Sequence, residues 1–156
     1  LIYSANWDHF SEVSFWDRVD YIGMSAYYEL TSTPNAPIEE MESSWRMIQF
    51  SLYDWLDRTQ ADGRLVFTEV GYPSQVGGAV KPWHYTRSAQ VDLEVQRRAF
   101  EAFWRVWGDD DRLYGTFFWN WWGLGGSQDT WYTIRGKPAL HEVKRFLRSK
   151  RDTSSK

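Results

Sequence analysis

Hydrophobic residues are arranged along this chain in two alternating patterns, short continuous runs and longer runs with helical spacing. The short runs are rich in β-branched and aromatic residues and therefore predict strands. They cover residues 1–7, 20–28, 64–71 and 113–119. Runs that are apolar over their whole length are typical of parallel strands with both faces covered. The pattern thus predicts four buried strands separated by helical segments.

Three longer segments place apolar residues at steps of three and four, which indicates amphipathic helices. The first begins near Pro37, and its inward face is Met41, Trp45, Ile48, Leu52, Trp55 and Leu56. The second is predicted over residues 88–107, with the inward face Val91, Val95, Ala99, Ala102, Phe103 and Val106. The third opens near Lys137 and Pro138, and its inward face is Leu140, Val143, Phe146 and Leu147. A short helical piece over residues 14–19 connects the first two strands.

Alternation of strands and helices predicts an α/β fold with parallel strands and right-handed crossovers. An open doubly wound sheet usually has a glycine-rich ligand loop after its first strand, whereas here that strand ends in Asn6-Trp7-Asp8. A complete barrel needs about 250 residues and eight strand-helix units, and this chain has 156 residues with four units. Residues 1–150 are therefore predicted to form half of a (β/α)8 TIM barrel, and residues 151–156 a polar, frayed tail.

Composition removes several functional classes. The net charge of -3 provides no basic field for nucleic acid or an anionic membrane. The basic cluster Lys144, Arg145, Arg148, Lys150 and Arg151 is interpreted as a solvated helix face. No apolar stretch is long enough to span a membrane. The absence of cysteine excludes disulfides and thiol chemistry.

No metal site and no cofactor are expected, because His9, His84 and His141 form no pair at metal-ligand spacing. The chain begins at Leu1 within a predicted strand and carries no signal-peptide pattern. We therefore expect a piece of a longer protein, and its localisation stays open.

One acid, Glu69, lies near the end of the third apolar run. Ionised carboxylates are rarely buried without a partner or a chemical task. Strand alternation predicts that Leu65, Phe67 and Glu69 share one face and that Gly71 follows at the barrel mouth, where barrel enzymes collect their functional residues. Two interpretations remain: a catalytic carboxylate, or a structural acid paired with an arginine or a helix N-terminus.

The other predicted strand ends carry amides, phenols and indoles. They comprise Asn6, Trp7, Ser25, Tyr27, Tyr28, Trp119, Asn120 and Trp121. Aromatic faces pack against the C–H side of a sugar ring, amides and phenols bind its hydroxyls, and a carboxylate attacks or stabilises the anomeric carbon. The set predicts an oligo- or polysaccharide substrate. Trp119 and Trp121 are predicted to share a face, with core packing as the alternative.

Several separated motifs, in the right order, resemble glycoside hydrolase family 113 through almost the whole chain. They are Tyr3-Ser-Ala-Asn-Trp-Asp8, Phe15-Trp-Asp17, Asp20-Tyr-Ile-Gly23, Ala26-Tyr-Tyr28, Phe67-Thr-Glu-Val-Gly-Tyr72 and Gly136-Lys-Pro-Ala139. Members of that family are clan A (β/α)8 barrels that act mainly on β-mannan with retention. The resemblance is to the C-terminal half of that barrel, so the four strands would be its fifth to eighth. Ser25 stands where members of the family often carry an acid.

The resemblance makes Glu69 the catalytic nucleophile, and the hypothesis of a retaining endo-β-mannanase assigns roles to further residues. Tyr27 or Tyr28 would orient Glu69. Trp119 would be the sugar platform, and Asn6, Trp7 and Trp121 would line the cleft. The acid/base glutamate of the clan ends the fourth strand, which would precede Leu1.

Two alternatives to half of a catalytic barrel are open. The parent could be a non-catalytic carbohydrate-binding barrel that keeps the aromatic cleft. The chain could also be a half-barrel that associates with a second copy, because two open strand edges need a partner. The expected partners are thus a saccharide, together with a missing N-terminal half-barrel or a second copy of the chain.

Overall fold

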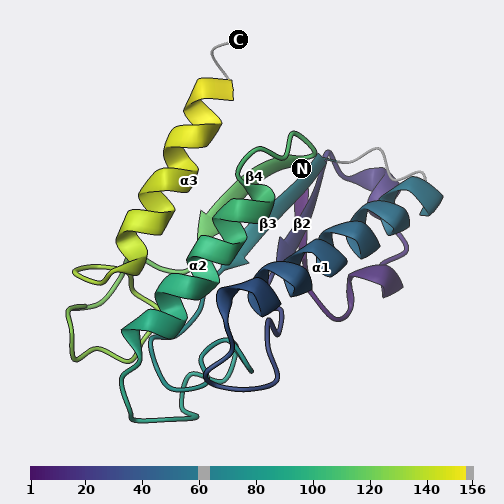
Figure 1. Ribbon diagram of the computed structural model, residues 1–156. Coiled ribbons are helices and arrows are strands. Elements are labelled where there is room, and N and C mark those ends of the chain that lie inside the picture. The colour runs from purple at the N-terminus through teal and green to yellow at the C-terminus, as the bar shows by residue number, and fades with distance from the viewer. Residues whose placement is uncertain (60–63, 154–156) are drawn as a thin grey trace.

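Strands and helices alternate along the whole chain in the computed structural model, which describes residues 1–59 and 64–153 (Figure 1). The strands are β1 (Ile2–Asn6), β2 (Tyr21–Ser25), β3 (Arg64–Val70) and β4 (Leu113–Phe118). The helices are α1 (Ile38–Thr59), α2 (Leu93–Trp107) and α3 (Ala139–Thr153), and two short 3-10 helices, Phe10–Glu12 and Trp16–Arg18, connect β1 to β2. The four predicted strands and three long helices are confirmed.

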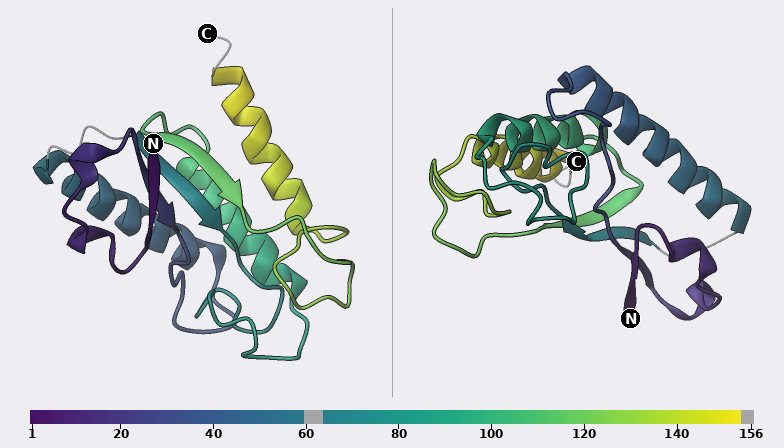
Figure 2. Two further views of the ribbon diagram at one scale, coloured as in Figure 1. Left: turned by 180° about the vertical axis from the view of Figure 1, so that it is seen from behind. Right: turned by 90° about the horizontal axis from the view of Figure 1, so that it is seen from below.

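The four strands form one parallel sheet in the order β1-β2-β3-β4. Figure 2 shows α1, α2 and α3 together on one side of this sheet. A doubly wound sheet would carry helices on both faces, so the arrangement is that of half a (β/α)8 barrel. The loops after β3 and β4 gather at one end of the sheet (Figure 1).

The core lies between the sheet and the helices and is largely aromatic. The Phe67 ring of β3 lies 4.9 Å from the Trp107 ring of α2, and the Trp45 ring of α1 lies 5.5 Å from that of Phe103. The Phe146 ring of α3 contacts the Phe103 ring at 5.2 Å. Aromatic pairs of this kind contribute about 0.5–1.5 kcal/mol each beyond the area they bury. All three helices are therefore held to the sheet through one cluster.

Two helix predictions are corrected. Helix α2 begins at Leu93 rather than at residue 88, because the Asp92 side chain caps it by accepting a hydrogen bond from the Val95 amide at 2.9 Å. Val91 precedes that cap and forms an isolated bridge with Gln75, so it lies on no helical face. Leu147 is exposed, whereas Val143 and Phe146 carry the inward face of α3.

The face of the sheet opposite the helices carries small side chains in its central row. Ser4, Gly23, Val66 and Gly115 are paired in register across the four strands. The Ser4 and Thr68 hydroxyls form a hydrogen bond of 2.5 Å on this same face, across β2. Large side chains from elsewhere could therefore approach the sheet closely here, as in the filled interior of a barrel.

At the C-terminus, α3 extends to Thr153, and residues 154–156 lie outside the described part of the chain. The predicted polar tail over residues 151–156, and with it the boundary at residue 150, stays a prediction. No helix among the described residues is long and apolar enough to cross a membrane.

Candidate functional site

A bulge in β3 decides where Glu69 points. Met24 of β2 pairs with Phe67, but the next residue, Ser25, pairs with Glu69, so β3 carries one extra residue. Phe67 and Val70 are both buried on the helix side, while Glu69 is only partly buried. The prediction that Glu69 shares a face with Phe67 is therefore wrong, because the bulge turns its side chain out of the core.

The sheet register places Glu69 in one row with Ser25 and Asn6. Asn6 pairs with Ser25, and Ser25 pairs with Glu69. The Ser25 hydroxyl donates to Asn6 Oδ1 at 2.9 Å, and Asn6 Nδ2 donates to Asp8 Oδ1 at 2.6 Å. The strand ends of β1, β2 and β3 thus meet at one edge and present an amide, a hydroxyl and a carboxylate side by side.

Glu69 accepts a hydrogen bond of 2.6 Å at Oε2 from the Tyr27 hydroxyl. Within the part of the chain that the structure describes, no arginine or lysine forms an ion pair with it. The interpretation of Glu69 as a structural acid paired with an arginine is therefore not supported. Burial, together with the bond to Glu69, raises the pKa of Tyr27 far above its usual value, so this phenol stays a donor.

The two neighbouring tyrosines have different roles. Tyr27 faces Glu69, whereas Tyr28 is buried and donates its hydroxyl to Met24 Sδ at 2.9 Å. Its ring packs against Trp45 at 5.7 Å in the core. The interpretation of Tyr28 as a substrate-binding or Glu69-orienting residue is corrected, because consecutive residues at this point face opposite sides.

Trp119 and Trp121 lie outside the core, with 43% and 60% of their surface exposed. Neither indole therefore packs in the core between the sheet and the helices. Strand β4 ends at Phe118, so strand alternation gives no reason for them to share a face. Trp7 is partly buried, and its ring lies 5.2 Å from Tyr28 and 5.4 Å from Trp83. Three of the predicted indoles are thus at this end of the sheet and reachable from outside.

Gly71 allows the backbone of Trp119 to cross directly over the end of β3. The Trp119 amide donates to the Val70 carbonyl at 2.7 Å, and a Cβ at position 71 would lie 2.2 Å from the Trp119 carbonyl oxygen. Real Cβ atoms do not approach backbone oxygen so closely, so any side chain here must displace Trp119.

We expect Gly71→Ala to lower the free energy of unfolding by about 1–3 kcal/mol, in the range of other overpacking substitutions. Gly115→Ala is the matched control, because its Cβ would meet only the two Val66 methyl groups, at the ordinary contact distances of 3.8 and 4.0 Å. That control should be neutral or stabilise by up to about 1 kcal/mol. Urea titration of both variants measures the difference, and equal midpoints would contradict the close approach.

A buried polar cluster that the sequence did not reveal connects the loop after β3 to the loop between β4 and α3. We call Ser74, Gln96, Asp129 and Lys137 the Lys137 cluster. The Lys137 side chain is fully buried, and its Nζ donates to Ser74 Oγ at 2.7 Å, to Asp129 Oδ1 at 2.6 Å and to the Trp131 carbonyl at 2.9 Å. Burial lowers the pKa of Lys137, and the bond to Asp129 opposes this shift.

Gln96 completes the connection by donating from Nε2 to the carbonyls of Tyr72 at 2.8 Å and Tyr132 at 3.0 Å. This fixes Tyr132, whose ring packs edge-on against Tyr27 at 6.0 Å and whose hydroxyl donates to the Pro82 carbonyl at 2.5 Å. Tyr132 is thus a further site residue, since it supports the phenol that contacts Glu69.

Buried phenols predict a loss of stability in alkali. Burial raises the pKa of five tyrosines, Tyr27, Tyr28, Tyr53, Tyr72 and Tyr132. In the unfolded chain they ionise near pH 10, so their contribution is fully present below about pH 10 and is lost as the pH rises further. Lys137 acts in the opposite sense, because its lowered pKa makes stability rise toward about pH 10.5. Urea midpoints at pH 8, 10 and 11 should fall steeply above pH 10, and a constant midpoint would contradict this balance.

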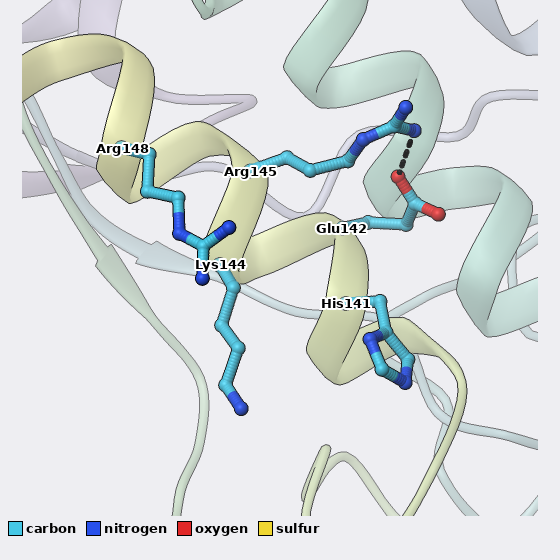
Figure 3. A pocket seen from close by; sticks show the side chains of 5 residues that line it. All are labelled: His141, Glu142, Lys144, Arg145 and Arg148. Atoms are coloured by element: carbon cyan, nitrogen blue, oxygen red, sulfur yellow. Dashed lines mark hydrogen bonds and ion pairs between the residues drawn. The ribbon is translucent and has the colours of Figure 1, made fainter.

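Three of the five basic residues predicted to form a solvated helix face, Lys144, Arg145 and Arg148, lie on an exposed face of α3, whereas the side chains of Lys150 and Arg151 lie outside the described part of the chain. Figure 3 shows His141, Glu142, Lys144, Arg145 and Arg148 along α3, around a shallow pocket of about 220 Å³. Arg145 Nη1 pairs with Glu142 Oε2 at 3.2 Å, and Lys144, Arg145 and Arg148 are exposed. Within residues 1–59 and 64–153, no cluster of three or more potential metal-binding side chains occurs.

The family model described as Glycoside Hydrolase Family 113 matches residues 1–137. Among solved structures, the chain resembles a complex of a GH113 β-1,4-mannanase, with 22% identity and a TM-score of 0.74. It also resembles the GH113 β-mannanase AaManA from Alicyclobacillus acidocaldarius in complex with ManMIm, with 32% identity and a TM-score of 0.73. No curated protein sequence matches the chain.

A β-glucuronidase from Ruminococcus gnavus, solved with D-glucuronic acid, has 19% identity and a TM-score of 0.60, so this likeness concerns the fold alone. The chain is covered over 95% and 96% by the two mannanases, but it spans only 45% and 44% of their length. It therefore corresponds to about half of such a barrel.

Proposed function

The chain belongs to glycoside hydrolase family 113, and from this membership we propose that the complete protein is a retaining endo-β-mannanase with Glu69 as its nucleophile. The observation that carries the proposal is the position of Glu69, turned out of the core by a bulge and bonded to Tyr27 at 2.6 Å. The two neighbouring structures named as β-mannanases support mannan as the substrate class.

In the proposed first step, Glu69 attacks the anomeric carbon of a β-linked mannose while the bond to the leaving oxygen breaks. Tyr27 engages Oε2 and holds the carboxylate in place, so Oε1 is the oxygen that attacks. A second carboxyl group protonates the leaving oxygen. That group then removes a proton from water, which displaces Glu69 and restores the β configuration.

The second carboxyl group must lie about 5–5.5 Å from the first in a retaining enzyme. Asp8 is the acid that lies next to Asn6, at the end of β1. Its hydrogen bond with His9 lowers the pKa of Asp8, so this carboxylate is a poor proton donor. We propose that the acid/base belongs to the half-barrel that completes the sheet beside β1. The central row of small side chains supports the presence of a second half-barrel, because it leaves room for larger side chains in the barrel interior. This row is Ser4, Gly23, Val66 and Gly115.

Sugar binding in this proposal depends on Trp119, Trp121, Trp7 and Asn6. Trp119 follows directly on β4 beside the end of β3, where an indole face can stack on the sugar attached to Glu69. Trp7 after β1 and Trp121 in the loop after β4 provide further indoles, and Asn6 provides an amide for hydroxyl groups.

The test is a completed barrel, made by joining this chain to the part of the Alicyclobacillus acidocaldarius mannanase that it does not match. A cooperative melt verifies folding, and each half alone serves as a control. We expect hydrolysis of β-1,4-linked manno-oligosaccharides, with the β-anomer appearing first by proton NMR. First appearance of the α-anomer would contradict retention, and binding without cleavage would favour the non-catalytic alternative.

A further inference from the structure

A cavity of about 650 Å³ lies between the two limbs of the loop that connects β4 to α3. Its lining residues are Asn120, Trp122, Gly123, Leu124, Asp129, Trp131, Tyr132, Thr133 and Arg135. The volume falls in the range of small-molecule sites, which span roughly 300–1,000 Å³. We propose that this cavity is a second sugar-binding site that holds a neutral hexose unit of the polysaccharide away from the cleavage point. The inference rests on the proposed function.

The cavity has a rigid aromatic wall. The Trp131 indole lines it and stacks on the Tyr85 ring, with centroids 5.2 Å apart and an angle of 30° between the planes. The two residues come from different loops and are still 53% and 47% exposed. An indole backed by a second ring and open to the outside is a platform for the C–H face of a sugar. The Lys137 cluster fixes it, because Lys137 Nζ donates to the Trp131 carbonyl.

Polar groups beside this wall are suited to hydroxyl groups. Asn120 Oδ1 is buried and has no hydrogen-bond partner among the described residues, so it needs a donor. Arg135 donates from Nη1 to the Gly123 carbonyl at 2.8 Å, and its guanidinium has further N–H groups that can donate. A sugar hydroxyl can donate to Asn120 and accept from Arg135. The Asp129 carboxylate in the same wall is already paired with Lys137 Nζ at 2.6 Å, so the neutral character of the sugar follows from the proposed mannan substrate and not from the charge of the wall.

The cavity lies close to Glu69 but is separated from it by two rings. Tyr132 lines the cavity and packs at 6.0 Å against Tyr27, and Tyr27 contacts Glu69. On its other side the cavity adjoins Trp121, because the Arg135 guanidinium lies 5.9 Å from the centre of the Trp121 ring. One polysaccharide chain can therefore run from the cleavage point at Glu69 into the cavity. This predicts a contribution to binding that depends on the length of the substrate.

Trp131→Ala in the completed barrel tests the site. We expect kcat/KM for mannohexaose to fall about tenfold, as expected for one lost aromatic contact, and the loss to shrink as the substrate is shortened. Tyr85→Ala, on the other loop, should cause a smaller loss with the same length dependence. Phe50→Ala, a 73% exposed aromatic on α1, should leave kcat/KM unchanged at every length.

Equal losses for all substrate lengths, or no loss for mannohexaose, would overturn the second site. Calorimetry on the Glu69→Gln form measures mannohexaose affinity without turnover, and there Trp131→Ala should weaken binding about tenfold as well. If the completed barrel binds mannohexaose but does not cleave it, the proposed function is wrong. The effect of Trp131→Ala on mannohexaose affinity then still shows whether the cavity binds sugar. Glucuronic acid in the same titration should not compete, and competition by it would contradict a neutral sugar.

Discussion

Replacing Glu69 by Gln in the completed barrel is expected to lower kcat on manno-oligosaccharides by about 10⁴-fold or more, as for other lost covalent nucleophiles. The amide keeps the size of the side chain but cannot attack the anomeric carbon or leave as a carboxylate. Tyr27 would still face position 69, so the fold and substrate binding should change little. Steady-state kinetics with calorimetry separates the lost chemistry from unchanged affinity.

Glu29→Gln is the matched control for this result. Glu29 is an exposed acid just after the Tyr27–Tyr28 pair, and nothing in the proposed chemistry uses it. Its removal should leave kcat unaffected. In Glu69→Ala, added azide should restore turnover and give an α-mannosyl azide, because the small anion attacks from the face that the carboxylate has vacated. Full activity of Glu69→Gln would contradict the assignment.

Asp129→Ala should cause the largest loss of stability among the substitutions considered, about 3–5 kcal/mol, as for other broken buried ion pairs. The fully buried Lys137 ammonium would lose its only charged partner among the described residues. The loop that carries Trp131 and Tyr132 would then be attached to the end of β3 mainly through hydrogen bonds from Ser74 and Gln96 to its carbonyl groups. Urea titration of the chain measures the free energy of unfolding.

A double-mutant cycle with Lys137→Met distinguishes the ion pair from loop packing. The double variant should be more stable than Asp129→Ala alone, because no charge is left buried without a partner. Asp57→Ala removes the exposed Asp57–Arg112 pair and should change stability little. If Asp129→Ala behaved like Asp57→Ala, the Lys137 cluster would not hold these loops.

Much of the fold was predictable because its signals are local. The period of Met41, Trp45 and Leu52 gave the inward face of α1, and the apolar runs gave all four strands. The bulge before Glu69 was not predictable, since it exists only in the register between β2 and β3. Strand alternation therefore placed Glu69 at the correct end of the sheet but on the wrong face.

The candidate site was predictable to the same extent. The rule that parallel strands bring their carboxyl ends together correctly grouped Asn6, Ser25 and Glu69. Adjacent tyrosines could not be distinguished, because the sequence does not show which of the two faces the core. The Lys137 cluster was missed for a different reason: Ser74, Gln96, Asp129 and Lys137 come from separate segments that only the tertiary fold joins.

The most direct test of the central claim is covalent trapping of Glu69 in the completed barrel with 2-deoxy-2-fluoro-β-mannosyl fluoride. The fluorine at C2 slows both the formation and the hydrolysis of the glycosyl-enzyme ester. Because the fluoride leaving group needs little acid assistance, formation is still faster than hydrolysis, and the ester should accumulate. Tryptic cleavage should release residues 65–87, in which Glu69 is the only carboxylate side chain. A single fluoromannosyl group on that peptide is the predicted result. A label on another peptide, or steady hydrolysis without any label, would contradict the account.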